Sequence, residues 1–312
     1  MSRSRPRVER VNWLADRAAL AAAHARSVAV GRAWSDQGPC RALRDRFDAV
    51  ARDDTDGAIE TAAAVLADPG IVTAMLTPLI AALRADPLFE PPLRVNRDSL
   101  RIGAVLFDHP AVSISAGVLS ADALAALPRP RTAVMTGRHL VVRYHRAVGA
   151  TLARWRLQDG VCRPIEPLTL ADGDLVRTDG RCEASLLTDA PRDVTTVTAM
   201  IRYGAGPAMR EFAIADGAAV RHATLDDSVS RTGTLLTLLR LSGRADAGPQ
   251  FEAASWHDEH HLRWTAMREW LALDVRGALG RLEEMAETDP HPDVRAAATT
   301  TLSVARTALC PA

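Results

Sequence analysis

The sequence predicts an α+β protein in which an antiparallel β-sandwich lies between helical segments at both ends of the chain. Alternating apolar and polar residues fill positions 131–222, whereas the residues on either side follow the helical period. Four Asp-Gly pairs punctuate the central block and supply the positive φ angles that tight turns need. Closely spaced strands and turns of this kind favour an antiparallel sandwich over parallel βαβ units.

Three segments of the central block carry the strand signal, at residues 139–145, 151–157 and 194–203. Each alternates with the period of two that is typical of a half-buried strand. We therefore expect one shared sandwich core, formed by Leu140, Val142, Tyr144, Trp155, Val197, Ile201 and Phe212.

Helical patterns flank this block. Residues 8–85 are rich in alanine and predict helices, and residues 100–106 and 111–115 predict two strands that a turn connects. After His222, a helix is predicted up to Leu241; it is apolar almost all round, so we expect it to be buried against the sheet. Three more helical segments follow. The predicted parts are a helical region (1–90), the sandwich (91–227) and a C-terminal helical segment (228–312).

Composition excludes several chemistries. The formal net charge is zero, which gives no global electrostatic reason to bind nucleic acid or an anionic membrane. All 38 basic residues are arginine. Without lysine there is no P-loop lysine, no Schiff-base lysine and no Ser-Lys pair.

The cysteines and the apolar runs indicate the compartment. None of the four cysteines forms a CxxC pair, so a zinc ribbon or a thioredoxin-like site is not expected. No stretch approaches the ~18 apolar residues of a membrane-spanning helix, and the N-terminal region is a poor secretory signal. We expect a cytoplasmic protein with free thiols.

The C-terminal segment resembles a HEAT-type helical repeat. Asp289-Pro290-His291-Pro292-Asp293-Val294-Arg295 is similar to the signature in which an aspartate precedes a Val-Arg helix start, and 263–268 looks like the second helix of a repeat. Aligned Asp and Arg side chains can tie successive turns together. The likeness covers one to two repeats, whereas solenoids need about three to be stable alone. It implies a protein-binding surface.

The central block resembles a cupin jelly roll. The stretch 168–175, with its Gly-Asp turn before a strand, is similar to a cupin sequence feature. The metal motif of that family, His-x-His with a later glutamate and a distant histidine, is missing from this sequence. His139 and His145 share a strand face, but six residues separate them by ~20 Å, too far to share one ion. The resemblance therefore implies a metal-free cupin-like module, and we expect no cofactor.

Two groups of residues are candidates for a site, and none is assigned a catalytic role. Arg143, Arg154 and Arg156, with His139 and His145, are candidates to bind a small anionic ligand; a solvent-facing sheet surface is the alternative interpretation. His257 and His261 would face the same way on a helix and are the candidate metal ligands. A zincin, however, needs glutamate directly after the first histidine, and Asp258 is there.

These observations favour a non-catalytic binding or adaptor protein, whose partner is another protein at the helical faces or a small anionic ligand. The alternative is a metal-dependent cupin-type enzyme, an oxygenase or isomerase that acts on a small anionic substrate. Nucleic-acid binding would rest on arginine content alone and predicts a steep salt dependence. The sequence does not define the oligomeric state.

Overall fold

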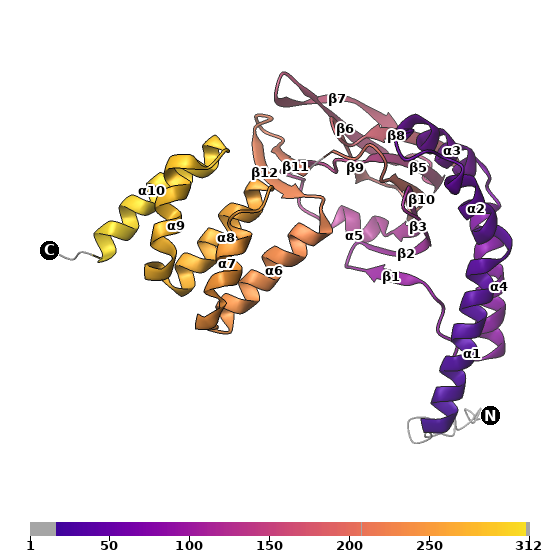
Figure 1. Ribbon diagram of the computed structural model, residues 1–312. Helices are drawn as coiled ribbons and strands as arrows, with labels where there is room; N and C mark the ends of the chain where they lie inside the picture. The colour runs from indigo at the N-terminus through magenta and orange to yellow at the C-terminus, as the bar shows by residue number, and fades with distance from the viewer. Residues whose placement is uncertain (1–16, 207, 310–312) are drawn as a thin grey trace, which may run out of the picture. The chain divides into compact units, whose positions relative to one another are not determined.

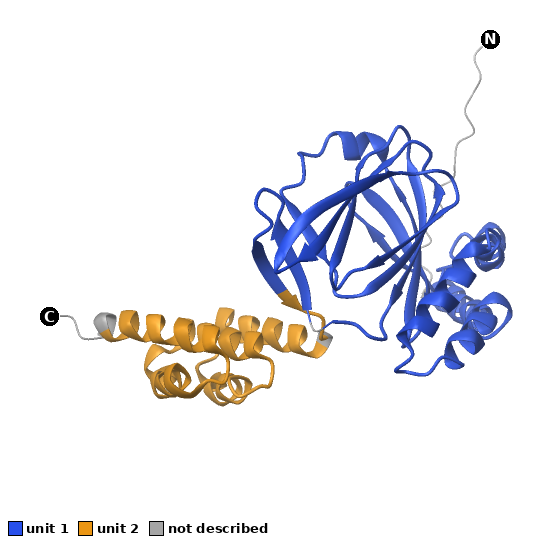
Figure 2. Ribbon diagram, turned by 90° about the horizontal axis from the view of Figure 1, so that it is seen from above, with its two compact units in different colours: residues 1–222 blue, residues 223–312 orange. Residues whose placement is uncertain are grey.

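The computed structural model describes residues 17–206 and 208–309, which form two compact units, 1–222 and 223–312 (Figure 2). The predicted α+β class with antiparallel sheets is confirmed. The N-terminal helices belong to the same unit as the sandwich, and the chain divides five residues before the predicted boundary at 227/228. The start of the predicted N-terminal helical region, residues 8–16, lies outside the described residues.

Four helices open the first unit: α1 (Arg17–Asp36), α2 (Gly38–Asp48), α3 (Thr55–Ala67) and α4 (Ile71–Ala85) (Figure 1). Local sequence explains their ends. Pro39 lies in the first turn of α2, where its missing N–H is not needed. The Asp54 carboxylate accepts a hydrogen bond from the Gly57 N–H at 2.8 Å and caps α3.

The strands form one six-stranded sheet and two three-stranded sheets. Their orders are β1-β2-β3-β10-β5-β8, β7-β6-β9 and β12-β11-β4. From β5 to β10 the chain passes back and forth between the six-stranded sheet and the β7-β6-β9 sheet, which is the arrangement of a jelly roll. A short helix, α5 (Ala121–Ala125), follows β3. The bounds are β1 (Arg94–Arg97), β2 (Arg101–Asp108), β3 (Val112–Leu119), β4 (Thr132–Met135), β5 (His139–Arg146), β6 (Thr151–Gln158), β7 (Val161–Thr169), β8 (Asp174–Asp179), β9 (Glu183–Asp189), β10 (Val194–Ile201), β11 (Ala208–Ala213) and β12 (Ala219–Thr224).

The N-terminal helices cover the outer face of the six-stranded sheet (Figure 2). Phe47 of α2 is fully buried, and its ring stacks on Phe107 of β2 at a centroid distance of 6.1 Å. His109, in the turn between β2 and β3, fastens α2 to the sheet: its Nε2 lies 3.0 Å from the Asp48 carboxylate, and its Nδ1 accepts the Ala111 N–H. The helices therefore bury the outer face of the sheet at its central strands.

The structure corrects the predicted single core. In antiparallel pairing, residues opposite each other point to the same face. Met200 pairs with Leu140, whereas Ala199 pairs with Val141, so Leu140 lies on the face opposite Val197 and Ile201. The outer cluster contains Val141, Val197, Ala199 and Ile201. The residues of β5 that share a face were predicted correctly. The prediction wrongly placed Leu140 on the same side of the sheet as Val197 and Ile201, because the N-terminal helices bury the face of β5 that looks polar in the sequence.

The interior of the sandwich holds two further apolar clusters. One gathers around Trp155 and Phe212 between the two three-stranded sheets, and the other around Tyr144, Leu152 and Val194. Burial raises the pKa of Tyr144 to about 12, so its phenol stays neutral. Six of the seven residues predicted to share one core therefore divide among three clusters, and Leu140 belongs to none of them.

The second unit is helical: α6 (Asp227–Leu241), a short 3₁₀ turn (Ala245–Ala247), α7 (Gly248–Ala254), α8 (His260–Leu273), α9 (Val275–Thr288) and α10 (Pro292–Leu309). It has its own core, which includes Phe251, Met267, Leu282 and Met285. Asp289, in the signature-like stretch, binds Arg263 of α8 and so ties α8 to the start of α10.

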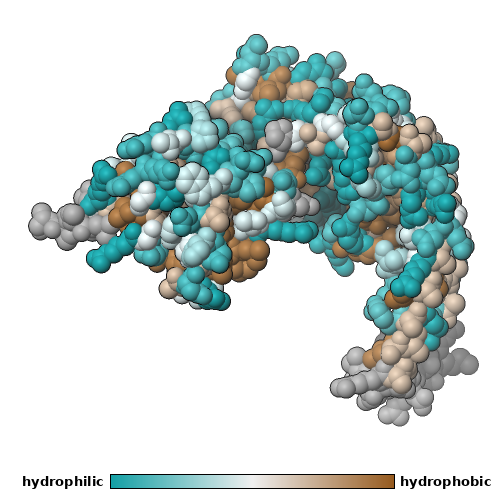
Figure 3. Space-filling view, viewed as in Figure 1, coloured by the Kyte–Doolittle hydropathy of each residue, from teal (hydrophilic) through white to brown (hydrophobic). Residues whose placement is uncertain are grey.

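Helix α6 differs from its prediction. It packs on α7 and α8 through residues such as Val229 and Leu236, which are buried. Leu235, Leu238 and Leu241 are more than half exposed, at 60%, 55% and 66%. Apolar surface is visible in Figure 3 over the part of the helical unit where α6 lies. The helix thus buries one apolar face and leaves these three leucines exposed.

Within the described residues, no single helix is long and apolar enough to cross a membrane; α3 and α4 meet that criterion only as a pair bent by 65°. Cys40, Cys162 and Cys182 are free thiols, as predicted, and Cys310 lies outside the described residues.

Candidate functional site

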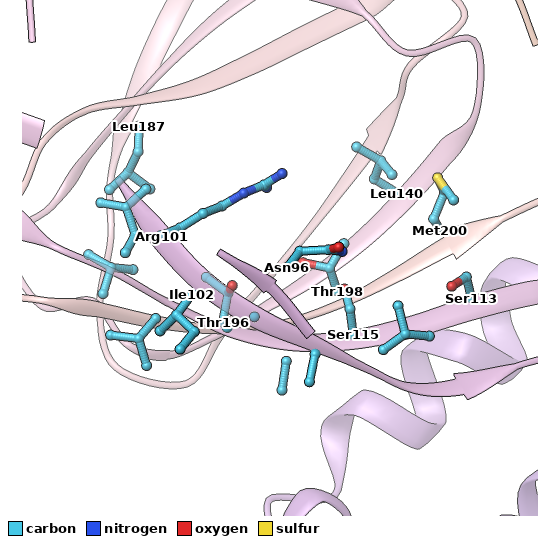
Figure 4. A pocket seen from close by; sticks show the side chains of 18 residues that line it. Asn96, Arg101, Ile102, Ser113, Ser115, Leu140, Leu187, Thr196, Thr198 and Met200 are labelled. Atoms are coloured by element: carbon cyan, nitrogen blue, oxygen red, sulfur yellow. The ribbon is translucent and has the colours of Figure 1, made fainter. Parts of the chain in front are cut away.

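A pocket of ≈ 320 Å³ opens on the inner face of the six-stranded sheet (Figure 4). Its walls come from β1, β2, β3 and β10, with Leu140 of β5 and Leu187 of β9. Figure 4 shows Arg101 and Leu187 toward one end, and Leu140, Met200 and Ser113 toward the other. The pocket therefore runs along the strands, between two ends of different composition.

Strand register places hydroxyl groups in this pocket. Ser115 of β3 pairs with Thr198 of β10, and Ser113 pairs with Met200, so these side chains share the inner face. The residues between them, including Ile114 and Val197, point to the helix-covered face and are buried there. The sequence alternation of hydroxyl and aliphatic residues on β3 and β10 thus separates a polar pocket from an apolar outer core.

Five polar side chains in the pocket have no hydrogen-bond partner among the described residues. Within residues 17–206 and 208–309, no side-chain hydrogen bond involves Asn96, Ser113, Ser115, Thr196 or Thr198. Hydroxyls elsewhere commonly bond to a backbone carbonyl, as Thr77 does to Thr73 and Thr237 to Gly233. Asn96 is exposed, and none of the four hydroxyls is among the buried side-chain atoms that lack a partner, so water reaches these groups and they are available to a ligand.

Two glycines hold part of the wall open. Gly103 of β2 pairs with Gly117 of β3, and both line the pocket. A Cβ on Gly117 would lie 3.1 Å from the Ile102 carbonyl oxygen and 3.4 Å from the Gly103 Cα, so side chains here would crowd the paired strand. Glycine in a strand often marks a close approach of a ligand or another backbone.

Arg101 is the basic residue in the pocket lining. Its side chain extends across the pocket in Figure 4, and its Nε lies 3.5 Å from a carboxylate oxygen of Asp98. Backbone N–H groups of Arg101 and Leu100 lower the pKa of Asp98, which keeps that carboxyl ionised. Arg101 is largely exposed, so solvent screens its charge.

The pocket residues do not fit a metal ion. The lining contains no histidine, cysteine, aspartate or glutamate, which are the side chains that bind metals in proteins. Elsewhere in the described part of the chain, no group of three or more such residues is arranged to hold an ion. The chemistry open to the pocket is hydrogen bonding, apolar contact and, at Arg101, attraction to an anion.

The three predicted arginine ligands lie outside this pocket. The Arg143 Nη1 donates to the Leu66 and Ala67 carbonyls at 3.1 and 3.0 Å, so Arg143 caps the C-terminal end of α3. Arg154 and Arg156 alternate with the buried Trp155 along β6 and take its opposite, outer face. Arg154 and Arg156 therefore share one face of β6, whereas Arg143 lies apart from them at the end of α3.

The two histidines predicted with them are also apart from the pocket. His139 lies on the outer face of β5, where its Nδ1 is 3.7 Å from Asp179, and its Nε2 is buried without a partner. Burial lowers the pKa of His139, although Asp179 opposes the shift. His145 is exposed near the end of the same strand.

The predicted metal pair does not share a helix. His257 precedes α8, and its Nδ1 accepts the Glu259 N–H at 3.0 Å, whereas His261 lies within α8. His261 and His291 instead flank the ring of His260, each at a centroid distance of 3.8 Å. Burial lowers the pKa of His260, and its two histidine neighbours add to that effect.

Sequence reasoning missed the pocket, although a signal was present. Ser113-Ile114-Ser115 and Thr196-Val197-Thr198 carry the same hydroxyl alternation, and the two strands pair so that Ser115 lies opposite Thr198. Hydroxyl residues on a strand are typical of a solvated face. Only the pairing of the strands shows that this face is enclosed.

No protein-family model matches this chain, and no curated protein sequence matches it. Among solved structures, the chain is similar to an RmlC-like cupin family protein with a double-stranded β-helix fold from Methanocaldococcus jannaschii, at 14% identity and a TM-score of 0.25, over 37% of this chain and 93% of that one. It is also similar to the capsular polysaccharide assembling protein CapF from Staphylococcus aureus, at 12% identity and a TM-score of 0.29, over 42% of this chain and 34% of that one.

The 7S globulin of Momordica charantia matches at 10% identity and a TM-score of 0.27, over 39% of this chain. The chain spans 35% of the globulin and 34% of CapF, about a third of each. Likenesses this low define neither an activity nor a ligand for this protein.

Proposed function

We propose that the sandwich unit is a non-catalytic binding module whose inner pocket takes a small, mostly apolar molecule with hydrogen-bonding groups. The observation that carries this is the set of five pocket side chains, Asn96 to Thr198, that have no partner within the described protein. Apolar walls with a few convergent polar groups are typical of small-molecule sites.

The pocket limits the size of the occupant. A volume of ≈ 320 Å³ is at the low end of the range of about 300–1,000 Å³ for ligand pockets. A short chain or a single ring with one polar head would fill it. Leu140, Leu187 and Val105 would contact the apolar part, and Ser115 and Thr198 the polar part.

A metal-dependent enzyme gains no support from this pocket, because its lining offers none of the usual ligands. A protein partner at the helical unit, which the HEAT-like resemblance implies, remains a prediction.

The first test is a titration with hexanamide, a neutral probe of suitable size. We expect a dissociation constant of about 1 mM, since about −4 kcal/mol is reasonable for a molecule this small. Backbone amide shifts in a ¹H–¹⁵N correlation spectrum should concentrate on β2, β3 and β10. Ser115→Leu fills the pocket and should abolish these shifts.

The matched control is Ser185→Leu on β9, which pairs with Arg154 and so lies on an outer face. It should bind hexanamide like the wild type. If Ser115→Leu does not melt cooperatively, Thr198→Val removes one hydroxyl at almost constant shape and should weaken binding severalfold. Unchanged binding in either folded pocket variant would refute the proposal.

A further inference from the structure

Arg138 lies beside the pocket at the end that Met200 closes. The residue immediately precedes β5, and its Nη1 lies 3.5 Å from the Met200 sulfur. Met200 lines the pocket next to Leu140, with which it pairs across β5 and β10. Arg138 itself is not among the lining residues, and its guanidinium contacts the pocket wall at Met200.

The guanidinium of Arg138 has no anionic partner in the part of the chain that the structure describes. Its Nε is buried and makes no hydrogen bond, and no carboxylate of the described chain lies within ion-pair distance of it. The buried Arg263 is paired with Asp289, whereas Arg143, whose Nε also has no partner, donates through its Nη1 to two backbone carbonyls. A thioether sulfur is only a weak acceptor, and a charge withdrawn from water without a partner costs free energy.

A carboxylate would supply what Arg138 lacks. Guanidinium and carboxylate groups form two parallel hydrogen bonds, which are stronger than bonds between neutral groups. Methionine has three rotatable bonds and changes rotamer readily, so Met200 can turn aside without moving the strand. The Ser113 hydroxyl, opposite Met200 on β3, would lie near the same head group.

We propose that the physiological ligand of the pocket is a small carboxylate with an apolar tail. The carboxylate of this ligand displaces the Met200 sulfur from Arg138 and binds the guanidinium, so Arg138 selects a negatively charged ligand. This rests on the binding function proposed above and adds the ligand class and the residue that selects it. The carboxylate takes the buried Nε and one Nη of Arg138, while the tail lies along Leu140 and Val105.

The test compares hexanoate with hexanamide at pH 7, two probes of nearly equal shape that differ in charge. Wild-type protein should bind hexanoate at least about tenfold more tightly than hexanamide, because hydrogen bonds to charged groups are the stronger ones. Arg138→Gln should abolish this preference and leave hexanamide binding unchanged. Hexanoate should also shift the Arg138 Nε–H resonance in a spectrum that detects arginine side chains.

Two further arginine variants test whether the preference for hexanoate over hexanamide comes from Arg138. Arg154→Gln, on the outer face of β6, should keep the full preference for hexanoate. Arg101→Gln removes the exposed charge in the lining; if it abolished the preference while Arg138→Gln retained it, the inference would be wrong. Met200→Ala removes the side chain that contacts Arg138 and should strengthen hexanoate binding severalfold, which tests the idea even if Arg138→Gln does not fold.

The results separate the two proposals. If neither probe binds the pocket, the binding function itself fails. If hexanamide binds but hexanoate binds no better, the pocket stands and the role of Arg138 is refuted.

Discussion

At the scale of single residues, Arg263 and Asp289 form the most deeply buried ion pair described here, with side chains 7% and 0% exposed. Arg263 Nε and Nη2 donate to the two carboxylate oxygens at 2.8 and 2.7 Å, and its Nη1 donates to two carbonyls before α8. Breaking such a pair by removing one partner leaves a buried charge uncompensated, which costs about 3–5 kcal/mol.

The pair predicts how the helical unit responds to acid. Burial raises the pKa of Asp289, but the hydrogen bonds from Arg263 and from the His291 N–H lower it further, so the pKa lies below the usual 3.8. A lowered pKa adds stability that is present above about pH 4 and is lost as pH falls through the folded value. Asp289→Asn should lower the melting temperature at pH 7 and flatten its decline below pH 4. A parallel acid profile in this variant would contradict the assignment.

At the scale of elements, the period of the apolar residues located individual strands correctly. It did not predict which faces of two paired strands lie on the same side of the sheet. The strands at 139–145 and 194–203 were located correctly, and Val197 and Ile201 do share a face. Sequence alone does not show which faces of two paired strands coincide, since a shift of one residue exchanges them. For the same reason, Arg143 looked like a ligand but caps α3.

The register of β10 can be tested with two neighbouring residues. Ile201 is fully buried in the outer core beneath the N-terminal helices, so Ile201→Ala should cost about 2–5 kcal/mol. Met200 lines the pocket, and Met200→Ala should cost less than about 2 kcal/mol, because no close-packed cavity forms. Urea unfolding of both variants measures the difference. Equal costs, or a larger one for Met200→Ala, would overturn the register.

At the scale of the whole molecule, the chain consists of two units with separate apolar cores. The outer core of the first unit joins α2, α3 and α4 to the six-stranded sheet, which explains why the helical region at the N-terminus is not a domain of its own. The core of the second unit draws only on residues from Val229 onward. A unit with its own core can in principle fold alone.

The position at which the chain is truncated should therefore determine whether the helical unit folds cooperatively. A fragment of residues 223–312 keeps the whole cluster, including Leu236, Leu262 and Met267, and should give a helical, cooperatively melting product by circular dichroism. A chain that ends at Gly248 separates α6 from α8, which exposes Val229 and Leu236, and each such buried side chain contributes about 1.5–3 kcal/mol. We expect that product to aggregate or to melt without cooperativity in its C-terminal part. If the fragment 223–312 were unfolded on its own, the second unit would depend on the first, and the division at residue 222 would not be a division in folding.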